Sequence, residues 1–414
     1  MQLIYEKSRP GRRGVAFDAL DVPAAALPAA LCRADAAALP EVSELDVVRH
    51  FTNLSRRNFG VDSHFYPLGS CTMKYNPKMA EAVAAYVGFS ELHPHMATSS
   101  ALWPLCQGAF EVVYELERVL AEIGGMREVS LQPIAGAHGE LAGTLMIAAY
   151  HRARGNAGKK DTILVPDSAH GTNPASAAIA GFKVVEVPSG RDGTMDVEAF
   201  KQALTDSVAG VMLTCPNTHG LFEPAVKEIA ALTHSVDALL YYDGANLNAI
   251  IGQARPGDLG FDVMHFNLHK TFATPHGMGG PGSGPVGVGE RLVPFLPGPR
   301  VVRTDSGYGL ATPEQSIGRV SGFFGNFMIA LRAYAYILCL GGEGLKKVSE
   351  HAVLNANYVY ARLKDAYDRA FDGRFMHECV FSAARQAANG AHAIDIAKAL
   401  LDAGQAITLR LATV

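Results

Sequence analysis

Lys270 lies in a setting that favours reaction with a carbonyl compound. It follows an apolar run, within Asn267-Leu-His-Lys270-Thr-Phe, and a glycine-rich segment, 277–284, comes shortly after it. A lysine amine that is desolvated in an aromatic, glycine-lined loop has a lowered pKa and can form a Schiff base. A single lysine more often faces solvent, so the role of Lys270 depends on its neighbours.

Asp243, His170 and Thr214 also stand at or just past the ends of apolar runs. A carboxylate at the end of a buried strand needs a partner, because an unpaired buried charge is costly. A histidine there can stack on a flat heteroaromatic ring or transfer protons. Each residue also has an ordinary interpretation: a helix cap or salt bridge for Asp243, a local hydrogen bond for His170, and turn chemistry after Thr214.

Gly136 and Ala137 open an expected helix directly after the apolar run 128–132. Small residues at this point let backbone N–H groups approach an anion at the helix N-terminus. A glycine-rich turn between a strand and a helix is also common without any ligand.

The order of these features is more informative than any one of them. Along the chain come an anion turn, a stacking histidine, a strand-end aspartate and a lysine. A pyridoxal 5'-phosphate (PLP) site needs a phosphate cradle, a ring stacker, a carboxylate for the pyridinium nitrogen and a Schiff-base lysine. The sequence therefore predicts a PLP site.

The elements that must position these residues alternate between short apolar runs and amphipathic stretches. This alternation predicts an α/β fold with a doubly wound, mostly parallel sheet, which binds ligands outside the carboxyl ends of its strands. The expected strands are 128–132, 162–165, 183–187, 208–214, 239–242, 262–266 and 284–288. The expected helices are 43–50, 108–124, 139–153, 172–180, 195–204, 224–235 and 315–340.

The ends of the chain lack the regular alternation of strands and helices that is expected for its middle. We expect an N-terminal arm with substrate loops (1–107), a large α/β domain (108–325) and a smaller C-terminal α+β domain (326–414). The last contains a helix from the break at 341–344 to about 370, a strand near 375–382 and a helix near 392–403. The basic segment 8–14 is either a solvated strap or an arm that wraps a partner subunit.

Composition excludes several protein classes. The 414 residues include 36 Lys and Arg against 40 Asp and Glu, a net charge of −4, which argues against a nucleic-acid binder. The most apolar stretch, 323–340, is interrupted by Asn326 and Arg332, so we expect no membrane span. Six cysteines without a CxxC pair, and a start without a secretory pattern, favour a cytoplasmic protein with reduced thiols.

Three motifs resemble one family closely. Gly69-Ser-Cys-Thr-Met-Lys-Tyr-Asn76, Asp167-Ser-Ala-His-Gly-Thr-Asn-Pro-Ala-Ser176 and Asn267-Leu-His-Lys-Thr271 look like the glycine-cleavage P-protein, in its two-chain form the second subunit. The likeness covers about 5–404. It implies a fold-type-I PLP enzyme, a glycine dehydrogenase (aminomethyl-transferring, decarboxylating). It further implies a first subunit in an α2β2 assembly and the lipoyl-carrying H-protein as co-substrate.

The resemblance also implies residue roles. Lys270 matches the Schiff-base lysine, Asp243 the pyridinium partner and His170 the ring stacker, and these three form the expected catalytic set. Gly136 and Ala137 fall on the phosphate turn. The expected cofactor pocket is completed by Thr214, Ala245, Asn267 and His269.

Three alternatives and one departure accompany this interpretation. Another fold-type-I enzyme, such as a desulfurase or amino-acid decarboxylase, would share the PLP residues, and a non-catalytic scaffold subunit would not need Lys270. A metal enzyme would draw on His93, His95, His265, His269 and His276, whose spacing matches no common zinc pattern. The segment 405–414 departs from the family pattern, so we expect a shortened C-terminal domain.

The loops 64–76 and 92–104 carry polar and aromatic residues without an evident core role. These residues are His64, Tyr66, Ser70, Thr72, Tyr75, His93, His95 and Trp103. They are either ordinary solvated loop residues or the lining of a channel in which a lipoyl arm reaches the cofactor.

Overall fold

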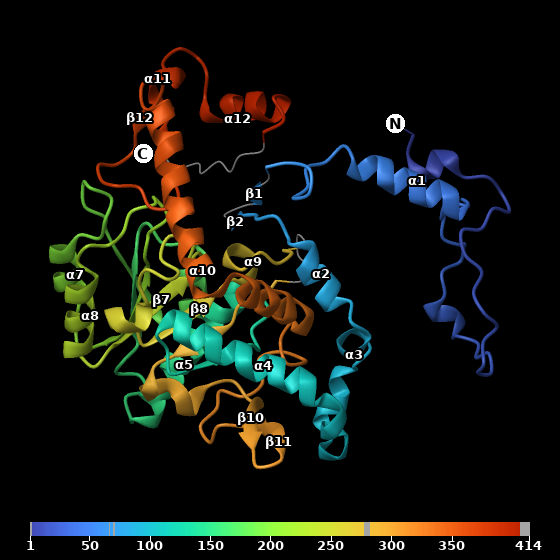
Figure 1. Cartoon of the computed structure of the whole chain (residues 1–414), viewed down its shortest axis with the longest axis horizontal. Helices are drawn as coiled ribbons and strands as arrows, with labels where there is room; N and C mark the ends of the chain where they lie inside the picture. Colours follow the sequence, from blue (N-terminus) through green and yellow to red (C-terminus); the bar gives the residue numbers. More distant parts are fainter. Residues whose placement is uncertain (1, 66, 69–70, 277–281, 406–414) are drawn as a thin grey trace.

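A seven-stranded sheet forms the centre of the molecule (Figure 1). The computed structural model describes residues 2–65, 67–68, 71–276 and 282–405. The strand order is β3-β9-β8-β7-β6-β4-β5; β9 pairs antiparallel with both β3 and β8, and all other pairs in this sheet are parallel. The strands are β3 (Glu128–Ser130), β4 (Thr162–Pro166), β5 (Lys183–Val187), β6 (Val208–Thr214), β7 (Leu239–Gly244), β8 (Val263–Phe266) and β9 (Val286–Val288). All seven expected strands, and the mostly parallel arrangement, are confirmed.

Apolar residues of the central strands alternate between two buried faces. In β7, Leu239 and Tyr241 face one core, and Leu240 and Tyr242 face the other. Helices α5 and α6 cover the first face, and α4, α7 and α8 contribute to the second. These helices are α4 (Trp103–Gly124), α5 (Gly136–Ala153), α6 (Thr172–Ile179), α7 (Val197–Ala203) and α8 (Val226–Ser235). Burial on both faces explains why the strands read as continuous apolar runs.

The helix expected over 315–340 is wrong at its start. The structure has loop up to Asn326, and α10 (Phe327–Leu363) begins after it. Gly318 and Gly325 have φ angles of 90° and 79°, which a right-handed helix does not allow. The expected break is confirmed at Gly341, whose φ of 59° interrupts α10.

The remaining elements surround this core. The hairpin β10 (Arg300–Thr304) and β11 (Gly307–Ala311) was not predicted. The expected C-terminal strand shrinks to β13 (Phe381–Ser382), paired with β12 (Asp368–Arg369), because most of 375–382 is irregular. The expected last helix is confirmed as α12 (Ala393–Asp402), after the short α11 (Ala384–Ala387). Residues 406–414, which carry most of the departing segment, lie outside the described part of the chain.

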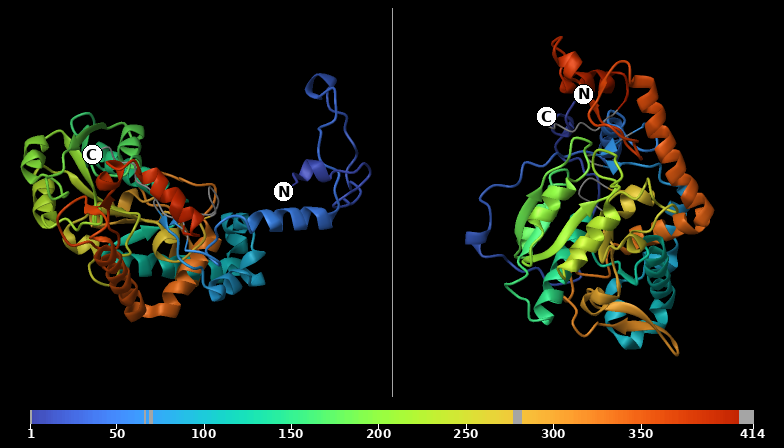
Figure 2. Two further views of the ribbon diagram at one scale, coloured as in Figure 1. Left: turned by 90° about the horizontal axis from the view of Figure 1, so that it is seen from above. Right: turned by 90° about the vertical axis from the view of Figure 1, so that its left-hand side faces the viewer.

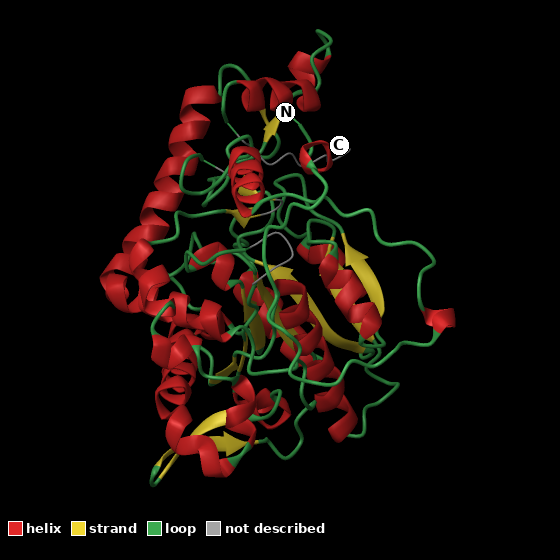
Figure 3. Ribbon diagram, turned by 90° about the vertical axis from the view of Figure 1, so that its right-hand side faces the viewer, coloured by secondary structure: helices red, strands yellow, loops and turns green. Residues whose placement is uncertain are grey.

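The N-terminal segment projects from the body of the molecule (Figures 2 and 3). Its helix α1 (Glu44–Ser55) begins as expected at Ser43, whose hydroxyl accepts a hydrogen bond from the Asp46 N–H at 3.2 Å. The chain then reaches the body through β1 (Pro67–Leu68), β2 (Cys71–Thr72), α2 (Lys78–Ala84) and α3 (Val87–Ser90). The division into 1–107, 108–325 and 326–414 stays a prediction.

Helix α10 is long and apolar enough to cross a membrane by length and composition alone. In its most apolar window 39% of the residues are buried within the protein, and it packs against α2 and α4. Core helices of soluble proteins pass the same test. The expectation of no membrane span therefore stays a prediction.

Candidate active site

All nine predicted site residues line one cavity of about 880 Å³. They are Gly136, Ala137, His170, Thr214, Asp243, Ala245, Asn267, His269 and Lys270. Thr214 and Asp243 stand at the carboxyl ends of the neighbouring parallel strands β6 and β7, and Asn267 directly follows β8. The cavity therefore lies where open α/β sheets bind ligands.

Asp243 is held by three hydrogen-bond donors. Its Oδ2 accepts from the Asn173 side-chain amide at 2.9 Å and from the Thr214 hydroxyl at 3.4 Å. Its Oδ1 accepts from the Ala245 backbone N–H at 3.0 Å. The carboxyl is 3% exposed, so these bonds fix its orientation in a nearly dry site.

The surroundings of Asp243 favour its ionised form. Burial alone would raise its pKa, but His265 and the hydrogen bond from Asn173 outweigh burial and lower the pKa. The His265 Nε2 lies 3.5 Å from Asp243 Oδ1, and its Nδ1 lies 2.7 Å from the Tyr241 hydroxyl oxygen. Burial lowers the pKa of His265 to about 4, so this ring is neutral near pH 7.

Lys270 lies on the single turn α9 (Leu268–Thr271) and is 7% exposed. The Lys74 amine donates a hydrogen bond to its main-chain oxygen, from the loop before α2. Burial lowers the pKa of Lys74 to about 7, and the charge of Lys270 acts in the same direction. The site thus contains two lysines in a poorly hydrated environment, of which sequence analysis had considered one.

Asn267 packs against the first residue of α5. A Cβ atom on Gly136 would lie 2.5 Å from Asn267 Oδ1, so any larger residue would force the Asn267 side chain to move. The Oδ1 atom is buried and has no hydrogen-bond partner among the described residues. Small residues at a helix start leave the backbone N–H groups accessible to an anion such as phosphate, to which the Asn267 side chain can donate only through its Nδ2 amide.

His170 and His269 occupy opposite environments. His170 is exposed on the cavity wall, and its Nδ1 lies 2.8 Å from the Thr172 hydroxyl oxygen. His269 is buried; burial lowers its pKa to about 3, and His276 and Lys270 act in the same direction. The exposed ring of His170 is therefore the one available to stack on a ligand.

The residues present fit PLP. A helix start with small residues, the Asn267 side-chain amide, the buried Lys270 amine and the ionised Asp243 line the same cavity. These groups match the phosphate, the aldehyde and the ring nitrogen of that cofactor. The residues 277–281 of the glycine-rich loop lie outside the described residues.

Asn173, His265 and Tyr241 were not assigned roles from the sequence. Asn173 was within a quoted motif, and His265 directly precedes Phe266 in an expected strand. Their roles depend on the pairing of Asp243 with His265 across β7 and β8. A sequence pattern shows how apolar and polar side chains alternate along a strand, but it does not show which residues of two neighbouring strands lie opposite each other.

The histidines considered for a metal site divide among three places. His265 lies beside Asp243. Atoms of His269, His276 and Cys71 lie within 4.8 Å of one another at the cavity. His93 and His95 stack on each other, with ring centroids 5.2 Å apart, in the loop before α4. They do not gather into one site in the described part of the chain.

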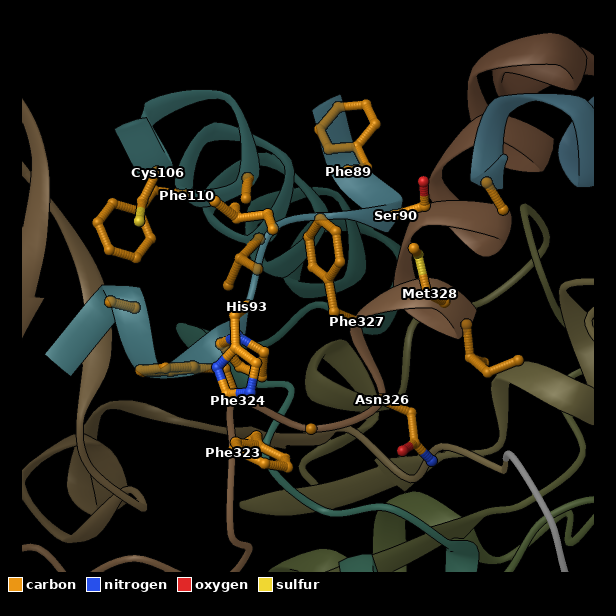
Figure 4. A pocket seen from close by; sticks show the side chains of 18 of the residues that line it. Phe89, Ser90, His93, Cys106, Phe110, Phe323, Phe324, Asn326, Phe327 and Met328 are labelled. Carbon is orange, nitrogen blue, oxygen red and sulfur yellow. The ribbon is translucent and has the colours of Figure 1, made fainter. Parts of the chain in front are cut away.

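Figure 4 shows a second cavity, of about 640 Å³. Aromatic side chains surround it, among them Phe89, Phe110 and Phe327, and His93 from the loop 92–104 lines it as well. The two cavities adjoin: Asn326 of the second donates a hydrogen bond to the main-chain oxygen of Gly282, which lines the first.

Comparison with known proteins gives a consistent result. A family model described as "Glycine cleavage system P-protein" matches residues 18–404. The "Probable glycine dehydrogenase (decarboxylating) subunit 2" of Lysinibacillus sphaericus is 55% identical over 409 residues, which cover 97% of this chain and 82% of that protein. The protein of the same name from Thermotoga maritima is 53% identical over 402 residues, which cover 97% of this chain and 83% of that protein.

Solved structures share the fold at low sequence identity. A crystal structure of glycine decarboxylase (P-protein) in inhibitor-bound form has a TM-score of 0.74 at 21% identity, with 92% of this chain and 85% of that chain covered. An Oryza sativa TDC with PLP and tryptamine has a TM-score of 0.67 at 13% identity, with 93% and 84% covered. The fold is that of fold-type-I PLP enzymes, as expected.

Proposed function

The chain belongs to the glycine cleavage system P-protein family, and from this premise we propose that it is the second subunit of a two-chain, PLP-dependent glycine dehydrogenase (decarboxylating). The observation that carries the proposal is the gathering of nine predicted residues, including Lys270 and Asp243, around one cavity. Relatives at 53–55% identity bear the corresponding name. The buried Lys270 supports an enzyme rather than a non-catalytic scaffold.

PLP, when bound, supplies an aldehyde for covalent attachment of an amine and a protonated ring that accepts electrons as carbon dioxide leaves. Lys270 would hold it covalently through Nζ. The ionised Asp243 keeps the proton on the ring nitrogen, since opposite charges favour both charged forms. His170 would stack on the ring, and the start of α5 with the Asn267 amide would hold the phosphate.

The proposed overall reaction takes glycine, the oxidised lipoyl disulfide of H-protein and one proton to carbon dioxide and an aminomethylated, reduced lipoyl arm. The C–CO₂ bond of glycine breaks and its electron pair forms a new C–S bond. The S–S bond breaks, and its second sulfur takes the proton. Water must be excluded, because a carbanion exposed to it would be protonated first.

The apolar second cavity suits the aliphatic part of a lipoyl arm. Its lining is dominated by hydrocarbon and aromatic side chains, such as Phe110, Phe327 and Met328 (Figure 4). It adjoins the proposed PLP cavity at Asn326. His93, which lines it, belongs to the loop 92–104 that the sequence suggested as a lining of the lipoyl channel. Of the other loop residues considered, Tyr66 and Ser70 lie outside the described residues. This lining supports entry of the arm from the side of α3 and α4.

The partner in this proposal is the first subunit, and the N-terminal segment is its docking region. Four large apolar side chains of α1 are about half exposed: Leu45, Val48, Phe51 and Leu54. Further exposed apolar residues precede it, including Phe17, which is 90% exposed. Exposed apolar surface of this extent is typical of a protein interface. It supports the interpretation of 8–14 as part of a wrapping arm.

Substrate competition tests the proposal against other fold-type-I activities. The purified chain, first subunit and lipoylated H-protein are mixed with PLP, and carbon dioxide release is measured with glycine, cysteine or an aromatic amino acid. We expect release from glycine alone, with reduction of the lipoyl disulfide. Sulfur release from cysteine, or decarboxylation of the aromatic amino acid in preference to glycine, would assign the chain to another reaction.

A further inference from the structure

Glu140 is a buried carboxyl group beside the proposed PLP site that has no role in the mechanism above. It lies on α5, four residues after Gly136, and is 3% exposed. Its Oε1 accepts a hydrogen bond from the Thr172 hydroxyl at 2.9 Å. Its Oε2 is buried and has no hydrogen-bond partner among the described residues. An ionised carboxylate in such a place would be poorly compensated.

The nearest acidic neighbour of Glu140 is Asp243. A side-chain oxygen of each, together with a ring nitrogen of His265, lies within 4.8 Å of the others. Two carboxyl groups this close in a buried site do not both ionise at neutral pH, because like charges and burial both oppose the second charge. The pair therefore carries one negative charge, and its surroundings decide which residue holds it.

The hydrogen bonds favour charge on Asp243. Asp243 accepts from Asn173, Thr214 and the Ala245 N–H, whereas Glu140 accepts from Thr172 alone. Burial raises the pKa of Glu140 to about 8, and the charge of Asp243 acts in the same direction. The titratable groups that face Glu140 from the elements packed against α5 are Asp243 and Tyr241 on β7, His265 on β8 and Lys270 on α9.

We propose that Glu140 is a positioning residue that stays protonated and so keeps the single negative charge of this carboxyl pair on Asp243. The inference deepens the proposed function and rests on it for its catalytic meaning. The reaction moves electrons toward the ring nitrogen, so a second anion there would oppose the step that Asp243 supports. A protonated Glu140 avoids that second charge.

The pH dependence of apoprotein stability tests the protonation state without the cofactor. Unfolded Glu140 ionises above its ordinary pKa of 4.5, whereas the folded group stays protonated to about pH 8. Within this window the folded state binds more protons than the unfolded state, so Glu140 lowers stability increasingly as pH rises. Glu140→Gln is neutral at every pH and removes this term.

Thermal unfolding of the apoprotein is measured from pH 5 to pH 9 for the wild type, Glu140→Gln and the surface control Glu111→Gln on α4. We expect the melting temperature of Glu140→Gln, relative to the wild type, to rise between pH 5 and pH 8 and then level off. The control difference stays constant with pH. A constant difference for Glu140→Gln would overturn the proposal.

Infrared difference spectra give a second measurement if unfolding is irreversible. The carbonyl band of a protonated carboxyl group should be present in the wild type at pH 7 and absent in Glu140→Gln; a carboxylate band in its place would overturn the proposal. In the complete complex, Glu140→Gln should keep turnover within a few fold, because glutamine is neutral like the protonated carboxyl group. Failure of glycine turnover in the wild type would count against the proposed function only, since the apoprotein measurements do not depend on it.

Discussion

At the scale of single residues, the charges of the site converge on Asp243. Its hydrogen bonds with Asn173 and the Ala245 N–H orient both carboxylate oxygens, and neutral His265 lies 3.5 Å away. The Tyr241 hydroxyl holds the far nitrogen of that ring. A fixed, dry carboxylate stabilises a cationic ring nitrogen more strongly than a solvated one, because the local dielectric is low.

Replacing Lys270 by alanine should abolish covalent PLP binding while leaving the fold intact, because the side chain is used in chemistry rather than in the apolar core. Borohydride reduction of the PLP-loaded protein, followed by peptide mapping, checks this. Lys78→Ala, at an exposed residue on α2, serves as the control and should keep the label. A label on Lys74, the second buried lysine of the site, would show that the assignment is wrong.

Replacing Asp243 by asparagine should lower glycine decarboxylation by about 100-fold or more, the scale of losing one preorganised electrostatic partner. The amide keeps the shape but cannot hold the proton on the ring nitrogen, so PLP should still bind. Turnover and PLP affinity are measured together on the complete complex. Near-normal turnover would remove Asp243 from this role.

The sequence was sufficient to find the site residues that directly follow apolar runs. It was insufficient to find the residues that hold these side chains in place. Lys270, Asp243 and Thr214 could be found because the carboxyl ends of parallel strands meet at one edge of a sheet. His265 lies within β8 and faces Asp243 only because the two are paired in register. Glu140 reaches the same place from a different element, through the packing of α5 on the sheet.

At the scale of elements, buried strands were predictable and surface connections were not. The run 208–214 matches β6 residue for residue, since this central strand is buried on both faces. The run 183–187 also matches β5, an edge strand whose three valines are enough to mark it although most of it is exposed. The hairpin of β10 and β11 was missed because one of its two strands, Arg300–Thr304, carries two arginines and a threonine and is only partly buried. The prediction that a helix begins at 315 was wrong because Gly318 and Gly325 have positive φ angles, which a right-handed helix does not allow.

Filling the second cavity should block the lipoyl step without affecting PLP. Ala109 on α4 lines that cavity, and Ala109→Trp would occupy part of it, at a cost of about 1–3 kcal/mol in stability. We expect transfer to lipoylated H-protein to fall at least tenfold, with an unchanged PLP spectrum. Ala101→Trp, at an exposed residue near the same helix, is the matched control. Equal transfer rates in both variants would exclude this route for the arm.

At the scale of the whole molecule, the N-terminal segment leaves a row of apolar side chains exposed. Phe51→Asp on α1 places a charge in the exposed apolar row and should weaken binding of the first subunit by about 30-fold, as for an interface hot spot worth ~2 kcal/mol. PLP binding by the isolated chain should not change. Asn53→Asp adds the same charge at an exposed polar residue of α1 and should have little effect. Binding is measured by titration calorimetry, and equal losses in both variants would contradict docking through the apolar row.

The isolated chain should be inactive or nearly so, even when loaded with PLP. Only Cys71 of the loop 64–76 is among the described residues that line its proposed PLP cavity, and the arm that would hold the first subunit lies exposed. An open site lets water protonate the carbanion before it meets the disulfide. Exchange of labelled bicarbonate into glycine, with lipoylated H-protein and with or without the first subunit, measures this. Full exchange by the isolated chain would contradict the two-subunit requirement. Absence of exchange in the complete mixture would contradict the proposed function of this chain.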